Sequence, residues 1–209
     1  MKVGLVVPVY VNFPGFAELV RSVDIPVTPH IIDNWNDNRG VSKGWNIGIE
    51  ESIKAGDEVT FIVNDDVVFS PGTMDKMIEG LSQFDLTTGI NARDEFDSSG
   101  SPDWIPHPDF SCFAIKPAEF VDKFGWFDEE FTPAYFEDND MFRRIELAGG
   151  TAMRNIHAPF YHKGSVTQNW GGSQVVTSPM FEMNRMYYIE KWGGQPGEEI
   201  FTTPFNEGV

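Results

Sequence analysis

Two adjacent carboxylates, Asp65 and Asp66, follow Asn64 at the point where the hydrophobic segment Val59 to Val63 stops. Hard divalent cations such as Mg²⁺ and Mn²⁺ prefer oxygen ligands of this kind. Neighbouring side chains on an extended strand point to opposite faces, so one carboxylate can bind a metal while the other binds a ligand hydroxyl. The alternative is a turn that caps the next element, a common use of Asn and Asp. The pair by itself leaves both interpretations open.

A second acidic group, Glu137 to Asp140, stands at the start of a helix predicted over residues 138–147. Acidic residues favour a helix N-terminus because they cap free N–H groups and complement the helix dipole. Three carboxylates within four positions exceed what capping needs. A carboxylate held in a cleft near others can have a raised pKa and serve as a general base. The cluster is therefore either a helix cap or a source of catalytic chemistry.

Two weaker signals accompany these carboxylates. The Gly-rich segment 38–48 enters a predicted helix that Ser42 is expected to cap, and phosphate groups bind at such helix starts. The segment has neither the dinucleotide-binding nor the P-loop spacing. His162 is a candidate metal ligand, although a lone histidine more often has no such role.

The first half of the chain alternates strands and helices, which positions the first carboxylate pair. Apolar runs predict strands at 3–9, 28–32 and 59–63, with amphipathic helices between and after them. This order implies a mostly parallel sheet with helices on both faces, in which ligands bind at the carboxyl ends of the strands. Tyr10 and Asp33 end two of these strands, so we expect Asp33 and Asp66 to face one cleft.

The second half is less regular. Residues 93–109 are rich in Gly, Pro, Ser and Asp and predict a long surface loop, a candidate lid. Strands are predicted at 110–115 and 151–156, the latter followed by a loop that carries His157 and His162. These elements complete the predicted α/β class of fold.

The length of 209 residues suits one α/β domain, residues 1–209. Within it, residues 1–92 are expected to form the ligand-binding half and residues 93–170 the catalytic half. A C-terminal helix and tail, residues 171–209, complete the chain, with a Met- and aromatic-rich packing helix predicted over 179–192.

The formal net charge of −17 repels phosphate backbones and anionic membrane surfaces, so polymeric nucleic acid is not an expected partner. A divalent cation can offset that charge locally for a small phosphorylated ligand. Cys112 is the single cysteine, which excludes an intrachain disulfide and suits a reducing, cytoplasmic location. No segment approaches the roughly 20 apolar residues of a membrane span, and residues 1–11 predict a buried strand rather than a signal peptide.

Taken together and in order, several of these segments resemble the inverting glycosyltransferases of family 2, which have the GT-A fold, and particularly the bacterial rhamnosyltransferase-like members. The resemblance covers roughly residues 3–165 and leaves 170–209 unmatched. It is carried by VVPVY (6–10), IIDN (31–34), NRGVSKGWNIGI (38–49), FIVNDD (61–66), GWFDEEF (125–131), YFEDNDMFRR (135–144) and HKGS (162–165).

This resemblance implies a nucleotide-sugar donor, linked to UDP or dTDP, and assigns the residues that would bind it. Tyr10 matches the aromatic that stacks on the base, and Asp33 matches the carboxylate that reads the base edge, commonly uracil. Asn38 and Asn46 fall in the segment that helps to hold the nucleotide, and Asp65 falls where the ribose binds.

The resemblance also assigns a metal and a base. Asp66 matches the metal ligand of a DXD motif, His162 matches a late histidine that completes the metal site, and the implied cofactor is Mn²⁺ or Mg²⁺. Asp138 matches the catalytic base. Two departures stand out: Asn64 replaces the first Asp of the motif, and Trp35-Asn36-Asp37 replaces the small, Thr-rich turn usual after Asp33.

The implied reaction is sugar transfer to a hydroxyl of a glycan, a protein side chain, a lipid-linked sugar or a modified nucleobase. Two other functions remain open. A nucleotidyltransferase would also use a carboxylate-bound metal, but it normally carries a basic Gly-rich loop after the first strand, where this chain has Val7 to Val11. A non-catalytic carbohydrate-binding or interaction module would not need both Asp66 and Asp138.

Overall fold

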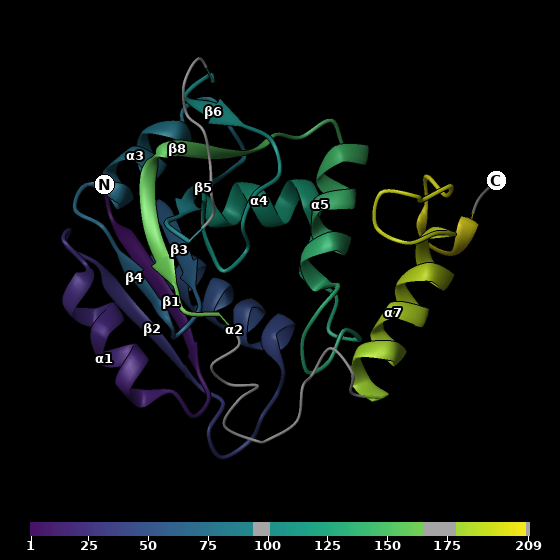
Figure 1. The fold of residues 1–209 in the computed structure, drawn as a ribbon, viewed down its shortest axis with the longest axis horizontal. Helices are drawn as coiled ribbons and strands as arrows, with labels where there is room; N and C mark the ends of the chain where they lie inside the picture. The colour runs from purple at the N-terminus through teal and green to yellow at the C-terminus, as the bar shows by residue number, and fades with distance from the viewer. Residues whose placement is uncertain (94–100, 165–178, 208–209) are drawn as a thin grey trace.

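A computed structural model describes residues 1–93, 101–164 and 179–207, and its central feature is an eight-stranded sheet (Figure 1). The strands are β1 (Val3–Val9), β2 (Thr28–Asp33), β3 (Val59–Val63), β4 (Val67–Phe69), β5 (Leu86–Asn91), β6 (Trp104–Ile105), β7 (Cys112–Ile115) and β8 (Ala152–His162). The helices are α1 (Phe13–Ser22), α2 (Val41–Ala55), α3 (Thr73–Gly80), α4 (Pro117–Phe124), α5 (Glu137–Leu147) and α7 (Pro179–Trp192), followed by a 3₁₀ turn at Pro204–Asn206. Within these ranges, no helix has both the length and the apolar character needed to cross a membrane.

The strand order is β2-β1-β3-β7-β5-β8-β4, and the short strand β6 pairs with β8 near Arg154 and Asn155. Strands β1, β2, β3, β5 and β8 run in one direction, and β7, β4 and β6 run in the other. The prediction of an α/β fold with a mostly parallel central sheet is confirmed. The antiparallel strands all come from segments outside the regular strand–helix alternation of the first half.

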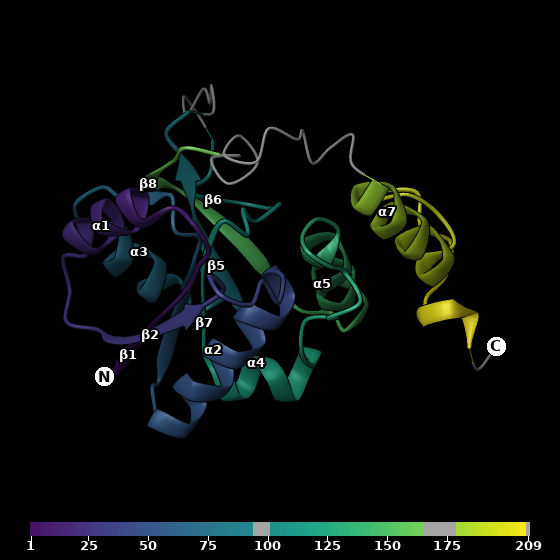
Figure 2. The ribbon, with the colours of Figure 1, turned by 90° about the horizontal axis from the view of Figure 1, so that it is seen from below.

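Helices cover both faces of the sheet, as Figure 2 shows, with α1 and α3 on one face and α2 and α4 on the other. The first face has an apolar core to which α1 contributes Leu19 and α3 contributes Met74 and Met77. The second face packs against Trp45 of α2 and Phe120 of α4. Helix α7 lies outside α5 and packs in a third apolar cluster of Phe131, Phe136, Tyr188 and Trp192, which confirms that it is a packing helix.

Three local predictions were wrong. Ser42 does not cap α2: Gly40 is the N-cap residue, and the buried Ser42 hydroxyl instead donates to the carbonyl of Phe131 at 3.5 Å. His157 and His162 lie within β8 rather than in a loop, because β8 continues past Ile156 to pair with β4 and β5. The segment predicted as a loop contains the short strand β6, which is anchored to β8.

Strands β4 and β5 and helix α4 were not predicted. β4 has only three residues and β5 is interrupted by Gly89, so neither shows a strand pattern strong enough to find locally. Gly89 is required where it stands, because a Cβ there would lie 2.1 Å from the carbonyl oxygen of Ala158 on the neighbouring β8. Such a close backbone approach is visible only after the strands have paired.

A buried polar cluster ties the amino end of the sheet to α2. The Asp57 carboxylate, whose side chain is fully buried, accepts from Ser52 Oγ at 2.8 Å and pairs with His30 Nε2 at 2.7 Å. Lys2 Nζ lies 3.3 Å from its other oxygen. Gly4 leaves room for the cluster, since a Cβ at that position would lie 2.5 Å from Asp57 Oδ2. Burial acts to raise the pKa of Asp57, but hydrogen bonds from His30, Ser52 and Lys2 outweigh it and lower that pKa.

We expect Asp57→Asn to lower the free energy of unfolding at pH 7 by about 1.5–3 kcal/mol, the range for hydrogen bonds to a charged group. Because the folded pKa of Asp57 is lowered, its stabilisation is complete above the unfolded pKa of about 3.9 and is lost as the pH falls through the folded value. Urea titrations from pH 6 to pH 2.5 should therefore show a shallower acid loss in the variant than in the wild type. Parallel curves would contradict this role for Asp57.

Candidate active site

The first group of site residues lies at one edge of the sheet. Tyr10 follows β1, Asp33 ends β2, and Asn64-Asp65-Asp66 follows β3. Since β1 pairs in parallel with both β2 and β3, all three carboxyl ends meet at the same edge. The expected placement of Asp33 and Asp66 at one edge therefore agrees with the topology, with β1 between their strands.

Asp65 joins the ends of β1 and β3. Its Oδ2 accepts from the backbone N–H of Tyr10 at 3.2 Å, and its backbone carbonyl accepts from Asn12 Nδ2 at 3.2 Å. Burial and the charge of Asp66 raise the pKa of Asp65 to about 6, although the hydrogen bond from Tyr10 acts in the opposite direction. The two carboxylates lie in the turn between β3 and β4 rather than on a strand, and they have different partners.

Asp66 contacts the carboxyl end of β8. Its Oδ1 lies 3.1 Å from His162 Nε2, and its Oδ2 accepts from the backbone N–H of Gly164 at 3.1 Å. Burial acts to lower the pKa of His162, but the hydrogen bond and charge of Asp66, with the charge of Asp109, outweigh it and raise that pKa. The two residues expected to bind a metal are thus brought together from distant parts of the chain.

A carboxylate suits Mn²⁺ or Mg²⁺ when phosphate and water complete the coordination, and the added imidazole favours the transition metal Mn²⁺ over Mg²⁺. The described residues hold no group of three or more His, Cys, Asp or Glu side chains arranged for a metal ion. Asp66 and His162 therefore fit a cation that shares its coordination with a bound diphosphate, rather than one enclosed by protein ligands alone.

Asp138 lies in the first turn of α5, the helix drawn to the right of the sheet in Figure 1. Its Oδ1 accepts from the backbone N–H of Asn139 at 2.8 Å. Burial and the charge of Asp109 raise the pKa of Asp138, against the effect of backbone hydrogen bonds. Beside it, Glu137 is buried and its Oε2 has no hydrogen-bond partner among the described residues. A raised pKa is the property that general-base catalysis near neutral pH requires.

Asp140 has a different environment. Its carboxylate is fully buried and accepts from Arg144 Nε at 3.0 Å and Trp192 Nε1 at 2.9 Å. Lys191 Nζ lies 2.6 Å from the same oxygen that Trp192 contacts. With three donors on its two oxygens, Asp140 joins α5 to α7 and is not available to an acceptor. Of the two neighbouring aspartates, Asp138 is the accessible one.

Sequence reasoning missed Asp109. Its charge raises the pKa of both His162 and Asp138, so this carboxylate acts electrostatically on a candidate metal ligand and on the candidate base. Its Oδ1 accepts from the N–H and the hydroxyl of Ser111 at 2.9 and 2.6 Å, and the Ser111 carbonyl accepts from Asn64 N at 2.9 Å. The available signal was an Asp two residues before a Ser at the start of a predicted strand, a common turn pattern with no functional meaning by itself.

Asp33 presents an exposed carboxylate at the end of β2. Its Oδ1 accepts from the Trp35 backbone N–H at 2.8 Å and its Oδ2 accepts from Asn36 Nδ2 at 3.2 Å. The rings of Trp35 and Phe13 are about half exposed and lie 5.1 Å apart between centroids. Each carboxylate oxygen retains a second lone pair, so Asp33 can still accept from a base.

The two asparagines of the Gly-rich segment have structural partners. Asn38 Oδ1 accepts from Gly40 N at 3.2 Å and shapes the turn into α2. Asn46 Nδ2 donates to the Phe127 carbonyl at 2.9 Å and to Glu129 Oε1 at 3.0 Å, and its Oδ1 accepts from Phe127 N at 3.0 Å. The Asn46 amide therefore holds the chain around Phe127. Any effect of Asn46 on nucleotide binding would be indirect, through the position of that segment.

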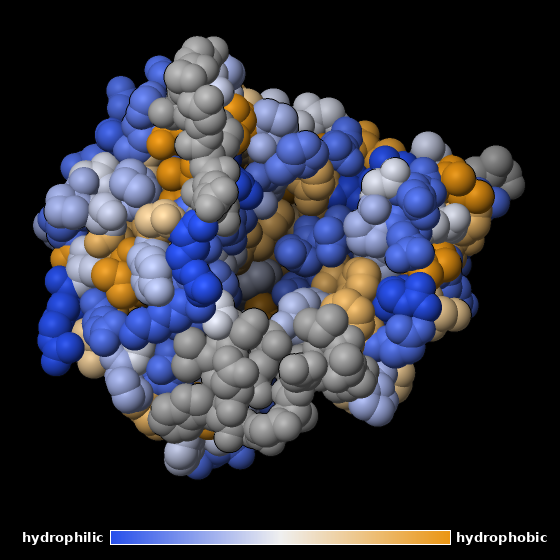
Figure 3. Space-filling view, viewed as in Figure 1, coloured by the Kyte–Doolittle hydropathy of each residue, from blue (hydrophilic) through white to orange (hydrophobic). Residues whose placement is uncertain are grey.

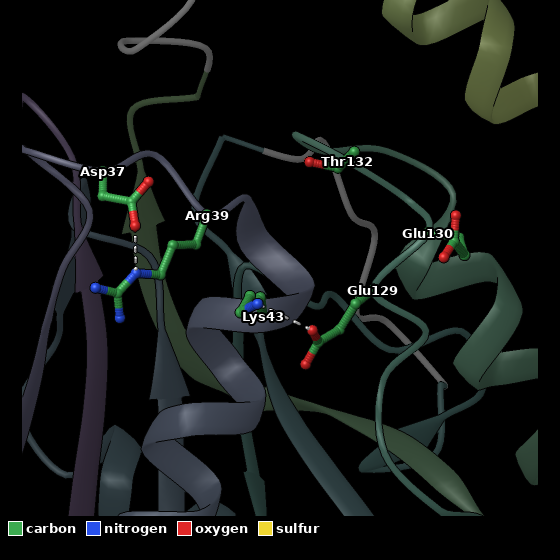
Figure 4. Close-up of a pocket in the computed structure, with 6 residues that line it drawn as sticks. All are labelled: Asp37, Arg39, Lys43, Glu129, Glu130 and Thr132. Carbon is green, nitrogen blue, oxygen red and sulfur yellow. Dashed lines mark hydrogen bonds and ion pairs between the residues drawn. The ribbon is translucent and has the colours of Figure 1, made fainter.

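A cavity of about 570 Å³ lies between the turn before α2 and the segment that follows Phe127 (Figure 4). Charges of both signs line it, paired between Arg39 and Asp37 at 3.1 Å and between Lys43 and Glu129 at 3.7 Å. The space-filling view shows a hollow near the middle of one face, with mainly hydrophilic residues at its rim (Figure 3). The cavity of Figure 4 is lined by Asp37, Arg39, Lys43, Glu129, Glu130 and Thr132.

No protein-family model matches the sequence, and no match is found among curated proteins. Solved structures do match. Mannosyltransferase PcManGT from Pyrobaculum calidifontis, in complex with GDP-Man and Mn²⁺, superposes with a TM-score of 0.62 and 15% identity over 81% of this chain and 59% of that chain. This is the GT-A fold. GalNAc-T7 with UDP, GalNAc and Mn²⁺ has a TM-score of 0.65 and 12% identity over 92% of this chain and 48% of that chain.

TarS from S. aureus in complex with UDP matches with a TM-score of 0.58 and 14% identity over 91% of this chain and 71% of that chain. In the structure of TarS 1–349, the match covers 61% of that chain, so the protein described here spans about three fifths of its length. At these identities the likeness establishes the fold, and the GT-A fold predicted from the sequence is confirmed. It does not by itself assign any site residue.

Proposed function

We propose that this protein is a metal-dependent inverting glycosyltransferase, which moves a sugar from a nucleoside-diphosphate sugar to an acceptor hydroxyl. The observation that carries the proposal is the contact between Asp66 and His162 at the carboxyl edge of a GT-A sheet. Structures of similar fold were solved with UDP, UDP-GlcNAc or GDP-Man, and two of them with Mn²⁺.

In this proposal the nucleotide binds over the ends of β1, β2 and β3. Tyr10 stacks on the base, Asp33 accepts from the base edge, and Asp65 binds the ribose. Asn38 and Asn46 shape the segment that holds the nucleotide, consistent with their hydrogen bonds to Gly40 and around Phe127. The Asp33 carboxylate can accept from a base with a ring N–H, and from the family resemblance we propose uracil or thymine, in UDP or dTDP, as that base.

The proposed reaction is a single displacement. Asp138 accepts the proton of the acceptor hydroxyl, and that oxygen bonds to the anomeric carbon as the bond from this carbon to the diphosphate oxygen breaks. Asp66 and His162 would hold Mn²⁺ or Mg²⁺, which supplies Lewis-acid stabilisation to the departing diphosphate when bound. Attack opposite the leaving group inverts the anomeric carbon, so no covalent nucleophile is required.

The acceptor is proposed only by chemistry: a hydroxyl on a glycan, protein, lipid-linked sugar or modified nucleobase. The free and buried Cys112 thiol agrees with the cytoplasmic location expected from the sequence. Burial and the charge of Asp109 raise the pKa of Cys112, which keeps this thiol protonated and unreactive.

A donor screen tests the proposal. The protein is incubated with UDP-, dTDP- and GDP-sugars, with Mn²⁺, Mg²⁺ or EDTA, and the free nucleoside diphosphate released by slow hydrolysis is measured. We expect release from one donor class, highest for UDP- or dTDP-sugars, and none with EDTA. Failure to bind or hydrolyse any donor in the presence of either metal would contradict the proposed function.

A further inference from the structure

The backbone immediately before Asp138 has an unusual conformation. Tyr135 and Phe136 have φ angles of 80° and 73°, in the left-handed region that side chains with a Cβ rarely adopt. Phe136 is also the N-cap residue of α5, and its side chain makes no capping hydrogen bond. Residues held in this way persist only where the surrounding structure compensates for the strain. Something outside this turn must therefore stabilise it.

The compensating contacts come from α7. Asn184 is 4% exposed, and its Nδ2 donates to the carbonyls of Ala134 at 2.9 Å and Tyr135 at 3.2 Å. The ring of Phe181 lies 5.3 Å from that of Tyr135 and 5.2 Å from that of Phe136. Because Phe181 and Asn184 are three residues apart, both project from one face of α7. This face contacts the left-handed turn with one amide and one ring.

We infer that Asn184 is a positioning residue for Asp138: its amide holds the left-handed turn, and the turn fixes the direction of the first turn of α5. The inference rests on the proposed function, in which Asp138 is the base. It gives α7 a role beyond packing. This helix, which the resemblance leaves unmatched, would set the position of the carboxylate that accepts the proton. Asp140, two residues after Asp138, is bonded to Trp192 of the same helix, so α7 contacts α5 on both sides of the base.

The test compares Asn184→Ala with Met183→Ala, a truncation of the adjacent, 61% exposed side chain on α7. We expect Asn184→Ala to lower kcat about 10-fold, the order expected when one anchoring hydrogen-bond donor is lost, and to leave the KM for donor within about twofold. Met183→Ala should leave both unchanged. An unchanged kcat in Asn184→Ala, or an equal loss in Met183→Ala, would overturn the inference.

A double-mutant cycle separates positioning from a general loss of structure. Glycine adopts φ near 80° without strain, so Tyr135→Gly makes the turn less dependent on Asn184. Asn184→Ala should therefore lower kcat less in the Tyr135→Gly background than in the wild type. Equal effects in the two backgrounds would count against the inference.

Hydrogen exchange makes the inference independent of turnover. The Asp140 amide donates to the Phe136 carbonyl at 2.9 Å, and its exchange reports whether the turn is held. The Asp140 amide should exchange faster in Asn184→Ala than in the wild type or in Met183→Ala. An unchanged exchange rate would overturn the inference. If the wild-type protein binds and hydrolyses no donor, the proposed function fails, while the exchange result still decides whether Asn184 holds the turn.

Discussion

Replacing Asp138 with Asn is expected to lower the rate of sugar transfer by about 10²–10⁴-fold, the usual contribution of a general base. Asn is nearly the same size and can still accept from the Asn139 backbone N–H, but it cannot take a proton. Donor affinity, measured by calorimetry with Mn²⁺ present, should change little because the proposed nucleotide site lies at the ends of β1 to β3. Stability should also persist, since the Asn side-chain carbonyl keeps the hydrogen bond from Asn139 and fits the same space.

Glu146→Gln is the matched control, because it removes one negative charge from an exposed position of the same helix. It should leave transfer unchanged. Asp140→Asn serves a second comparison: it should lower stability through the contacts with Arg144 and Lys191. Normal transfer by Asp138→Asn would show that Asp138 is not the base.

The pH dependence follows from the same carboxylate. Burial and the charge of Asp109 raise the pKa of Asp138, so protonation removes the base at a higher pH than for an ordinary aspartate. The rate of transfer should therefore fall on the acid side through this raised pKa. In Asp138→Asn, that limb should be absent from the residual rate.

Replacing Asp66 with Ala is expected to abolish the Mn²⁺-dependent part of nucleoside diphosphate affinity. Loss of partners that only support a ligand commonly costs 10–100-fold in metal affinity, so loss of a direct ligand should cost at least about 100-fold. Titration of UDP with Mn²⁺ and with EDTA measures this difference in each protein. The wild type should bind more tightly with Mn²⁺, and Asp66→Ala should bind with the same weak affinity in both conditions.

Asp75→Ala, at an exposed position of α3, is the control for the same truncation away from the site. It should retain the full Mn²⁺ dependence. Circular dichroism should show that Asp66→Ala remains folded, because Asp66 is bonded mainly to the end of β8 rather than packed in an apolar core. A wild type with equal affinity in Mn²⁺ and EDTA would contradict the metal site itself.

The sequence by itself determined the part of the fold that we propose binds the nucleotide. Continuous apolar runs at Val3 to Val9 and Val59 to Val63 are long enough to require burial on both faces of a sheet. Right-handed crossovers through helices then place the carboxyl ends of such strands together. Tyr10 follows the first run directly, Asp66 lies three residues past the second, and Asp33 ends the strand predicted between them, so local pattern and topology sufficed to predict one edge for all three.

Only the tertiary structure determined how the proposed catalytic and metal-binding residues are arranged. β7 runs antiparallel between β3 and β5, and β8 extends to His162 because it pairs with β4 and β5, none of which a local pattern specifies. Those pairings alone bring His162 to Asp66. Helix α7 is the plainest case: its sequence predicted a packing helix, but only docking against the left-handed turn at Tyr135 gave Asn184 its partners. Contacts between residues distant in the chain depend on the relative placement of whole elements, which no local periodicity encodes.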